Sequence, residues 1–426
     1  MDMLSEQFIS KEIPGAFKIS DDLDIGCLEW VDDALTLTVG VENTGNVLNK
    51  VDEFAKVNKL EWGLQKCQVM MIGKKIKVPE KWNLGSDYIE NTTSYKYLGD
   101  ELTSNCKNDK NILLRDNKVS ALVRQINTAA SSDIMIGIET KVILKMYETR
   151  IIPCLLNNAE SWTLSTSDEK KLDAIGIKTM KRLFNLPTTS PNVAVIYTFG
   201  LLYITQAIDK KRFIYLHRML NREESKWSLK ALLVLREMNI GWAENMFQKL
   251  NEYSLESDLT TIKQYTLNEW KEKVRVAVLK RNGQKLLENC VVMNNDVAKV
   301  LTKTKHIHDA LTNTKYNCEP LNCIIGTNKQ RARTIFLSQN GMLECGKNMK
   351  GTIPEICNEC LVPDDENHRL NSCKKWTREN RDGAPCDFRD IYSDNPGTVN
   401  EIIDEIEKVW ETRYANGRMK KNLKNR

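Results

Sequence analysis

Alternation of apolar and polar residues near the start of the chain predicts a β-hairpin. An apolar run leads into the adjacent aspartates Asp32 and Asp33, and a second apolar set follows at every other position: Leu35, Leu37 and Val39. A period of two places these side chains on one face, because successive residues of a strand point to opposite sides. The pattern therefore predicts two strands joined by a tight turn, with two carboxylates at its tip.

The next 60 or so residues alternate between helical and strand patterns. After the hairpin, apolar positions recur at three- and four-residue spacing, which predicts a helix capped at its start by Thr44 or Asn46. The apolar positions of this helix are Val47, Val51, Phe54 and Ala55. Apolar runs over residues 66–72 and twice between 82 and 97 predict short strands. This part of the chain is therefore predicted to be a small α+β unit.

From Asn111 onward the spacing changes to that of long amphipathic helices. Three successive segments repeat apolar residues every three or four positions, which predicts three helices that each bury one face. The three faces are Val119, Leu122, Val123, Ile126 and Ala130; Val142, Leu144, Met146, Tyr147 and Ile151; and Leu172, Ile175, Thr179 and Leu183. Pro187 and Pro191 mark the end of this region.

Residues 192–350 carry mostly helical patterns and little recognisable chemistry. Trp227, Trp242 and Trp270 are predicted core anchors, because large aromatic side chains are usually buried. His306 and His308 are predicted to be exposed to solvent rather than to bind a metal, since no third ligand lies nearby. A final amphipathic helix is predicted from Val399, Ile402, Ile403, Ile406, Val409 and Trp410.

Composition and charge are those of an ordinary globular protein. The 426 residues suffice for two or three domains, and the net charge of +5 permits a nucleic-acid partner without requiring one. No secretory signal begins the chain, and no apolar stretch approaches the roughly 20 residues of a membrane span. We therefore expect an intracellular protein of the nucleus or cytoplasm, without a membrane partner and with its 12 cysteines mostly reduced.

Four residues near the end of the chain have the spacing of a zinc site. Cys357 and Cys360 are separated by two residues, and His368 and Cys373 follow with a turn-like acidic segment between. Two thiolates at this spacing grip one side of an ion, and a histidine and a third cysteine complete a tetrahedron. Because all four ligands are of the type that Zn²⁺ prefers, the pattern predicts a closed structural zinc knuckle rather than a chance grouping.

The adjacent aspartates allow two interpretations. Asp32 and Asp33 on a rigid turn can hold Mg²⁺, which prefers oxygen ligands and a phosphate-bearing substrate. The alternative is a surface turn in which aspartates merely tolerate the backbone geometry.

Basic residues gather in two places that could meet nucleic acid. Lys178, Lys181 and Arg182 lie on the third predicted helix, where the alternative is a solvated face. Residues 413–426 carry six basic residues and no acidic one, Arg418, Lys420 and Lys421 among them. Such a tail contacts phosphates without reading sequence, and a frayed solubilising tail is the alternative.

The order of these features resembles the C-terminal part of a reverse transcriptase of non-LTR (LINE-type) retrotransposons. The resemblance spans about residues 13–373. Trp30-Val31-Asp32-Asp33 is similar to the aromatic-x-Asp-Asp hairpin of the polymerase palm, and Gly63 with Lys66 to the next palm motif. The remaining matching stretches are residues 95–100, similar to the primer-grip region, residues 153–164 and 181–186, similar to the thumb, and the Cys-Cys-His-Cys knuckle.

The resemblance implies roles and a domain order. Asp32 and Asp33 would be metal-binding carboxylates of the polymerase centre, Lys66 would lie near the phosphates of the nucleotide, and Tyr97 and Gly99 would contact nucleic acid. The fold would be α+β: a partial palm over residues 1–105, a helical thumb over 106–190, a helical connector over 191–350, a zinc knuckle over 351–380, and an amphipathic helix with a basic tail over 381–426. RNA or DNA would be the partner, bound largely without sequence preference.

The chain departs from the family in one respect that bears on activity. A polymerase of this family takes a further aspartate from an earlier palm strand, and only 31 residues precede Asp32. We therefore expect a truncated RNA-directed DNA polymerase fragment that binds nucleic acid but does not polymerise DNA alone. Mg²⁺ would act only where the catalytic site is completed.

Two other interpretations remain open. The chain is alternatively a host-adopted helical scaffold for protein interactions, stapled by the zinc knuckle, or part of a longer active enzyme whose start lies upstream of Met1. No pattern indicates an oligomeric state.

Overall fold

A computed structural model of the chain describes its course at residues 15–21, 23–30, 33–73, 77–130, 138–223, 226–294, 297–300, 304–313, 319–340, 342–343, 356–357, 360–371, 388–393 and 395–406. The fold is mixed α and β, as expected, with short strands in the first quarter and helices thereafter. It divides into two compact units. Unit 1 comprises residues 1–114, 158–168 and 211–271, and unit 2 comprises residues 115–157, 169–210 and 272–426. The predicted domains follow one another along the chain, whereas these units interleave.

The strands of unit 1 form small separate sheets. Antiparallel pairs join β1 (Phe17–Ser20) to β2 (Leu23–Ile25), β3 (Cys27–Trp30) to β4 (Asp33–Thr36), and β8 (Ser94–Tyr97) to β9 (Asp100–Thr103). A three-stranded sheet has the order β5-β7-β6, with β5 (Gln68–Met70) parallel to β7 (Asp87–Thr92) and β6 (Lys81–Leu84) antiparallel to it. The prediction of a small α+β unit is therefore confirmed.

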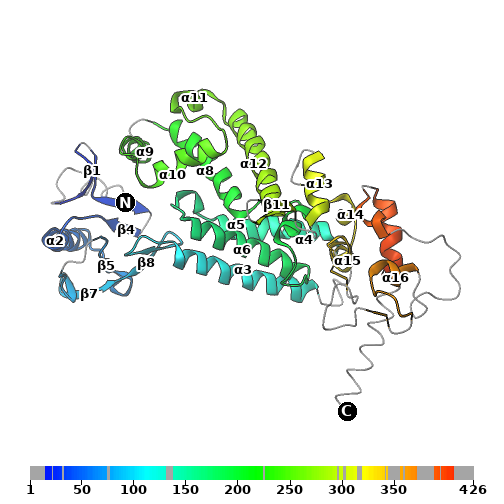
Figure 1. Ribbon diagram of the computed structural model, residues 1–426. Coiled ribbons are helices and arrows are strands. Elements are labelled where there is room, and N and C mark those ends of the chain that lie inside the picture. Colours follow the sequence, from blue (N-terminus) through cyan, green and yellow to red (C-terminus); the bar gives the residue numbers. More distant parts are fainter. Residues whose placement is uncertain are drawn as a thin grey trace, which may run out of the picture. The chain divides into compact units, whose positions relative to one another are not determined.

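Helix α2 (Val41–Asn58) packs on the three-stranded sheet, as Figure 1 shows at the blue end of the chain. Trp82, Leu84 and Ile89 form the buried cluster between them. The prediction that Thr44 or Asn46 caps this helix is wrong, because the helix begins about one turn before Thr44. Gly40, with a φ of +93°, stands at its N-cap, and the Thr44 hydroxyl donates 2.9 Å to the Gly40 carbonyl from inside the helix.

The remaining elements of unit 1 are helical. They include η4 (Ala159–Ser161), α9 (Trp227–Glu237), α10 (Gly241–Glu252), α11 (Leu259–Gln264) and the parts of α8 (Ile204–Leu220) and α12 (Leu267–Cys290) that lie within residues 211–271. Trp270 is fully buried and donates from Nε1 to the Phe213 carbonyl at 2.9 Å, so it is a core anchor as predicted. The prediction for Trp227 is wrong: it is 40% exposed, because α9 buries the opposite face through Leu229 and Leu232.

Unit 2 is built mainly from helices. They include the C-terminal part of α3 (Asp109–Ala130), α4 (Thr140–Met146), a π-helical turn η3 (Tyr147–Ile151), α5 (Ile152–Leu156), α6 (Thr166–Leu183), α7 (Asn192–Thr198), α13 (Lys305–Asn313), α14 (Asn322–Ile325), α15 (Lys329–Gln339), α16 (Glu366–Asn371), η6 (Phe388–Tyr392) and a helix over residues 396–406. The hairpin of β10 (Val291–Asn294) and β11 (Val297–Val300) was not foreseen in this helical region.

The predicted apolar faces are mostly buried. Leu172, Leu183 and Ile151 are fully buried, and Val399, Ile402, Ile403 and Ile406 confirm the last amphipathic helix within the described residues. Val409 and Trp410 lie outside them. The prediction that Val142 is buried is wrong. Ile143 is buried instead, because the face of α4 that continues into Tyr147 passes through residues 140, 143, 144 and 147.

The prediction that His306 and His308 are an exposed pair is also wrong. The His306 ring lies 5.0 Å from the Tyr392 ring, and burial lowers the pKa of this histidine to about 4. His308 is 27% exposed and lies beside Asp309. Helix α13 and η6 thus pack together through two residues more than 80 positions apart, which a local pattern cannot indicate.

No helix in the described parts of the chain is long and apolar enough to cross a membrane.

Gly176 on α6 offers a test of the helix packing in unit 2. A Cβ there would lie 2.6 Å from Cγ1 of the buried Ile204 on α8, so Gly176→Ala must push α6 and α8 apart. We expect it to lower the free energy of unfolding by about 1–2 kcal/mol, net of the better helix propensity of alanine. Urea unfolding followed by circular dichroism measures this change.

Gly45→Ala is the matched control. Gly45 also lies inside a helix, α2, and a Cβ there meets nothing within 4 Å. We expect this variant to be unchanged or more stable by about 1 kcal/mol. Equal effects of the two substitutions would contradict the packing described.

Candidate functional site

The predicted Asp-Asp hairpin is present as strands β3 and β4. Trp30 pairs with Asp33 at the end of the ladder, so the chain reverses through the two residues between them. Asp33 is exposed at this tip. Asp32 lies outside the described residues. The hairpin is therefore confirmed, whereas the metal-binding role of its aspartates stays a prediction.

Tyr95 connects β8 to the segment that carries Lys66. Its hydroxyl donates to the backbone carbonyl of Lys66 at 3.0 Å, joining β8 to η1 (Leu64–Lys66). Burial raises the pKa of Tyr95 first, and the negative charges of Asp33 and Cys67 raise it further. Asp33, Lys66 and Tyr95 therefore lie in one region of unit 1, and the Lys66 side chain there is exposed.

The hairpin of β8 and β9 packs against the segment after residue 157. Its turn residues Leu98 and Gly99 have φ angles of +47° and +91°, the left-handed geometry of a tight two-residue hairpin turn. Asn158 donates to the Leu98 carbonyl at 3.0 Å, and Trp162 Nε1 donates to the Asp100 carboxylate at 3.3 Å. Gly99 is therefore required by the turn, and the predicted contact of Tyr97 and Gly99 with nucleic acid stays a prediction.

Cys357, Cys360 and His368 form a candidate metal centre in unit 2. Their ligand atoms all lie within 4.8 Å of one another, and no other group of three or more metal-binding side chains occurs among the described residues. Cys357 and His368 are buried, and Cys360 is half-buried. Three of the four predicted ligands are thus brought together, and Cys373 lies outside the described residues.

Backbone hydrogen bonds shape the loop that carries the two cysteines. Cys357 N–H donates to the Val362 carbonyl at 2.9 Å, and Leu361 N–H donates back to the Cys357 carbonyl at 2.8 Å. Leu361 has a φ of +60°, and a bridge between Ile356 and Pro363 closes the loop. The resulting tight turn brings the two cysteines, separated by only two residues, close enough to share one ion.

The third ligand comes from a short helix that follows the loop. The Asp365 carboxylate accepts from the His368 backbone N–H at 2.8 Å, which caps the start of α16. The segment between the cysteines and His368, predicted to be turn-like, therefore ends in a helix that begins at Glu366. A buried ion pair between Arg369 and Asp364, with Nε 2.6 Å from Oδ1, ties the helix to the loop.

The donor atoms fit a metal ion. His368 Nε2 is buried and has no hydrogen-bond partner, a costly arrangement for an imidazole nitrogen unless a ligand completes it. Cysteine sulfur and imidazole nitrogen together suit borderline-soft divalent ions. The arrangement can therefore hold an ion between the loop and α16.

The basic residues predicted on α6 already have partners within unit 2. Lys178 pairs with Asp116 at 3.3 Å, and Arg182 donates to the Ser120 hydroxyl at 3.1 Å. Lys181 donates to the Thr188 carbonyl and the Asn192 amide oxygen, and burial lowers its pKa. Their role in nucleic-acid binding stays a prediction. Arg418, Lys420 and Lys421 lie outside the described residues.

The sequence interpretation did not assign roles to Tyr95 or to the Asp364–Arg369 pair. Tyr95 stands two residues before Tyr97, so the strand period placed both on one face of β8. The ion pair joins residues five apart across a helix start, a spacing for which neither helix nor strand periodicity predicts a contact.

We expect the purified chain to carry one divalent metal ion, and His368→Ala or Cys360→Ser to reduce the ratio of metal to protein to a small fraction of one. Each substitution removes one of the donors on which the affinity of the site depends. Metal analysis by mass spectrometry after dialysis measures the ratio. Cys106→Ser, at an exposed free cysteine, is the control and should keep its metal. A metal-free wild-type protein would contradict the assignment.

Comparisons with known proteins identify no family for the chain. No protein-family model matches it, and a search of curated proteins finds no similar sequence. The function must therefore be argued from the hairpin tip at Asp33, the contacts around residues 95–100 and the metal centre.

Proposed function

We propose that the chain derives from an RNA-directed DNA polymerase of the non-LTR retrotransposon type and binds RNA or DNA without reading its sequence. The observation that carries the proposal is the meeting, within unit 1, of motifs that are far apart in the chain. Tyr95 contacts Lys66, and Trp162 contacts Asp100, across 29 and 62 residues respectively. The four residues come from three stretches that resemble different parts of the polymerase: Lys66 from a palm motif, Tyr95 and Asp100 from the primer-grip region, and Trp162 from the thumb.

These contacts support the proposal because chance motif matches have no reason to pack together. A tryptophan N–H that reaches a carboxylate from a distant segment fixes the β8–β9 hairpin against η4. Trp162 is 5% exposed, so the contact is part of a packed region rather than a surface encounter. A supported hairpin of this kind suits a role in positioning a nucleic-acid strand.

DNA synthesis by this chain alone is not part of the proposal. Two-metal phosphoryl transfer needs carboxylates from more than one element, held close enough to share cations. Among the described residues, the three side chains that could share an ion are two cysteines and a histidine, far in sequence from Asp33. Mg²⁺ at Asp32 and Asp33 would therefore need a carboxylate from elsewhere.

The metal centre has a structural role in the proposal. Two sulfur donors and one imidazole nitrogen are typical ligands of Zn²⁺, and Cys373 would close the tetrahedron. Such an ion can supply roughly 10 kcal/mol of folding free energy, which suits a segment as short as residues 356–371. The zinc ion then holds the loop and α16 together and takes no part in chemistry.

A host-adopted interaction scaffold is the second candidate. The partners of Lys178, Lys181 and Arg182 within unit 2 favour it, since these cations serve helix packing. The two candidates differ in one measurable property. The affinity for a nucleic acid bound through its phosphates falls steeply as the salt concentration rises. A protein scaffold would not bind an oligonucleotide even at low salt.

We expect the full chain to bind a 20-nucleotide RNA, with an affinity that falls about fifty-fold between 50 and 200 mM salt if about four phosphates are neutralised. Fluorescence anisotropy measures this. Replacing Arg418, Lys420 and Lys421 by glutamine should reduce the slope of log affinity against log salt concentration by about two units. The control replaces Lys56, Lys141 and Lys145, which are exposed by 63–71%. No binding at 50 mM salt would favour the scaffold.

We also expect no primer extension by the purified chain on an RNA template with Mg²⁺ and nucleotides. The physical reason is the incomplete set of carboxylates around Asp33. A gel assay with labelled primer measures extension, and Asp32→Ala is the control that distinguishes this chain's activity from a contaminant. Extension that is lost in Asp32→Ala would refute this part of the proposal.

A further inference from the structure

Trp227 stands out because it is exposed although tryptophan is usually buried. It lies in the first turn of α9 and is 40% exposed. The opposite face of the same helix is buried through Leu229 and Leu232. Helix α9 therefore packs against the core without the Trp227 side chain, which leaves the indole accessible to a ligand.

Three exposed cations lie near Trp227 in sequence. Lys230, one turn later on α9, has its Nζ 5.8 Å from the ring centroid, Lys226 directly precedes the tryptophan, and Arg222 contacts Ser228 beside it. We call Arg222, Lys226, Trp227 and Lys230 the α9 platform. All four belong to unit 1.

The intrachain contacts of these cations are loose. Lys226 lies 3.8 Å from Glu223, with both side chains more than half exposed. Arg222 donates to the Ser228 hydroxyl at 3.4 Å. An exposed pair of this kind contributes little, so a phosphate can replace the Glu223 carboxylate at small cost.

We propose that the α9 platform is a stacking site for single-stranded nucleic acid. An aromatic ring flanked by cations is the combination that holds such strands: a base stacks on the ring, and the phosphates on either side meet the lysines. The site deepens the proposed function, since it rests on nucleic-acid binding by the chain.

The charges favour this ligand over a protein. Residues 222–230 carry three cations against two acidic residues, Glu223 and Glu224, and the one acidic residue of α9, Glu237, lies at its other end. Leu233, 47% exposed, extends the face with apolar surface. An acidic, leucine-containing peptide is therefore the competing ligand, and the test includes it.

The test compares binding of a 12-nucleotide oligouridylate and a 12-nucleotide oligothymidylate to the full chain and to Trp227→Leu. Loss of one stacked base should weaken binding about tenfold. Tyr88→Leu, at a tyrosine 63% exposed on β7, is the matched control and should bind like wild type. The double variant Lys226→Gln, Lys230→Gln should reduce the salt slope by about 1.4. Thermal unfolding of each variant verifies that it folds.

Photocrosslinking locates the contact independently. An oligonucleotide with one 5-iodouridine should crosslink to the peptide that contains Trp227, identified by mass spectrometry. Wild-type binding that Trp227→Leu leaves within twofold would overturn the platform and leave the proposed function intact. Absence of any oligonucleotide binding would overturn both. Binding of a glutamate- and leucine-rich peptide that depends on Trp227, without oligonucleotide binding, would assign the surface to a protein partner.

Discussion

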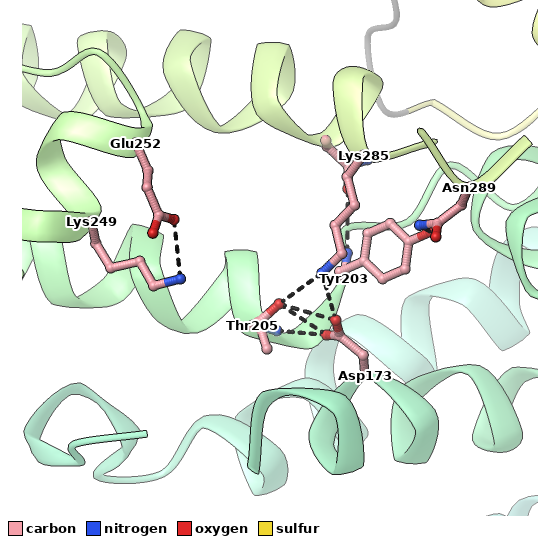
Figure 2. Close-up of polar contacts among 8 residues, drawn as sticks. Asp173, Tyr203, Thr205, Lys249, Glu252, Lys285 and Asn289 are labelled. Atoms are coloured by element: carbon pink, nitrogen blue, oxygen red, sulfur yellow. Dashed lines mark hydrogen bonds and ion pairs between the residues drawn. The ribbon is translucent and has the colours of Figure 1, made fainter. Parts of the chain in front are cut away.

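The packing of unit 2 depends on the hydrogen bonds and the ion pair that the Asp173 carboxylate makes. It accepts from the backbone N–H of Thr205 at 2.9 Å and from Lys285 Nζ at 2.7 Å (Figure 2). It therefore caps the start of α8 and ties α12 to α6 in one contact. Lys285 also lies 4.3 Å from the ring centroid of Tyr203, whose hydroxyl accepts from Asn289. Because the carboxylate is largely buried, removing its cation would cost about 3 kcal/mol or more.

The contacts of Asp173 orient α6 and so determine which neighbours its other side chains meet. Gly176, one turn after Asp173, lets Ile204 approach closely, and burial together with the Asp173 charge raises the pKa of Tyr147 nearby. Lys178 and Arg182 then lie on the side of α6 away from Asp173, where α3 supplies their partners. A helix held on both faces leaves few of its cations for a ligand. Basic residues on a packed helix are thus weaker indicators of nucleic-acid binding than cations on an exposed turn.

The sequence was most informative where a feature is determined by neighbouring residues. The β3–β4 hairpin and the gathering of Cys357, Cys360 and His368 follow from local periodicity and ligand spacing, and both are found. Burial was harder to predict, because it depends on what another segment places over a side chain. Trp227 and Trp270 are the same residue type, yet only the second is fully buried, where it donates to the carbonyl of Phe213 more than 50 positions away. Contacts such as that of Asp173 with Lys285, 112 residues apart, leave no local signal.

The metal centre and the Asp364–Arg369 ion pair both bear on how one short segment is held in place. Residues 356–371 are too few to bury a core of their own, so polar contacts must hold them. A buried ion pair alone stabilises little, since desolvation offsets much of its attraction. It does fix α16 against the loop, however, and so brings the imidazole of His368 to the two cysteines. The ion pair therefore supplies geometry, and an ion held by the three ligands would supply free energy to the same short segment.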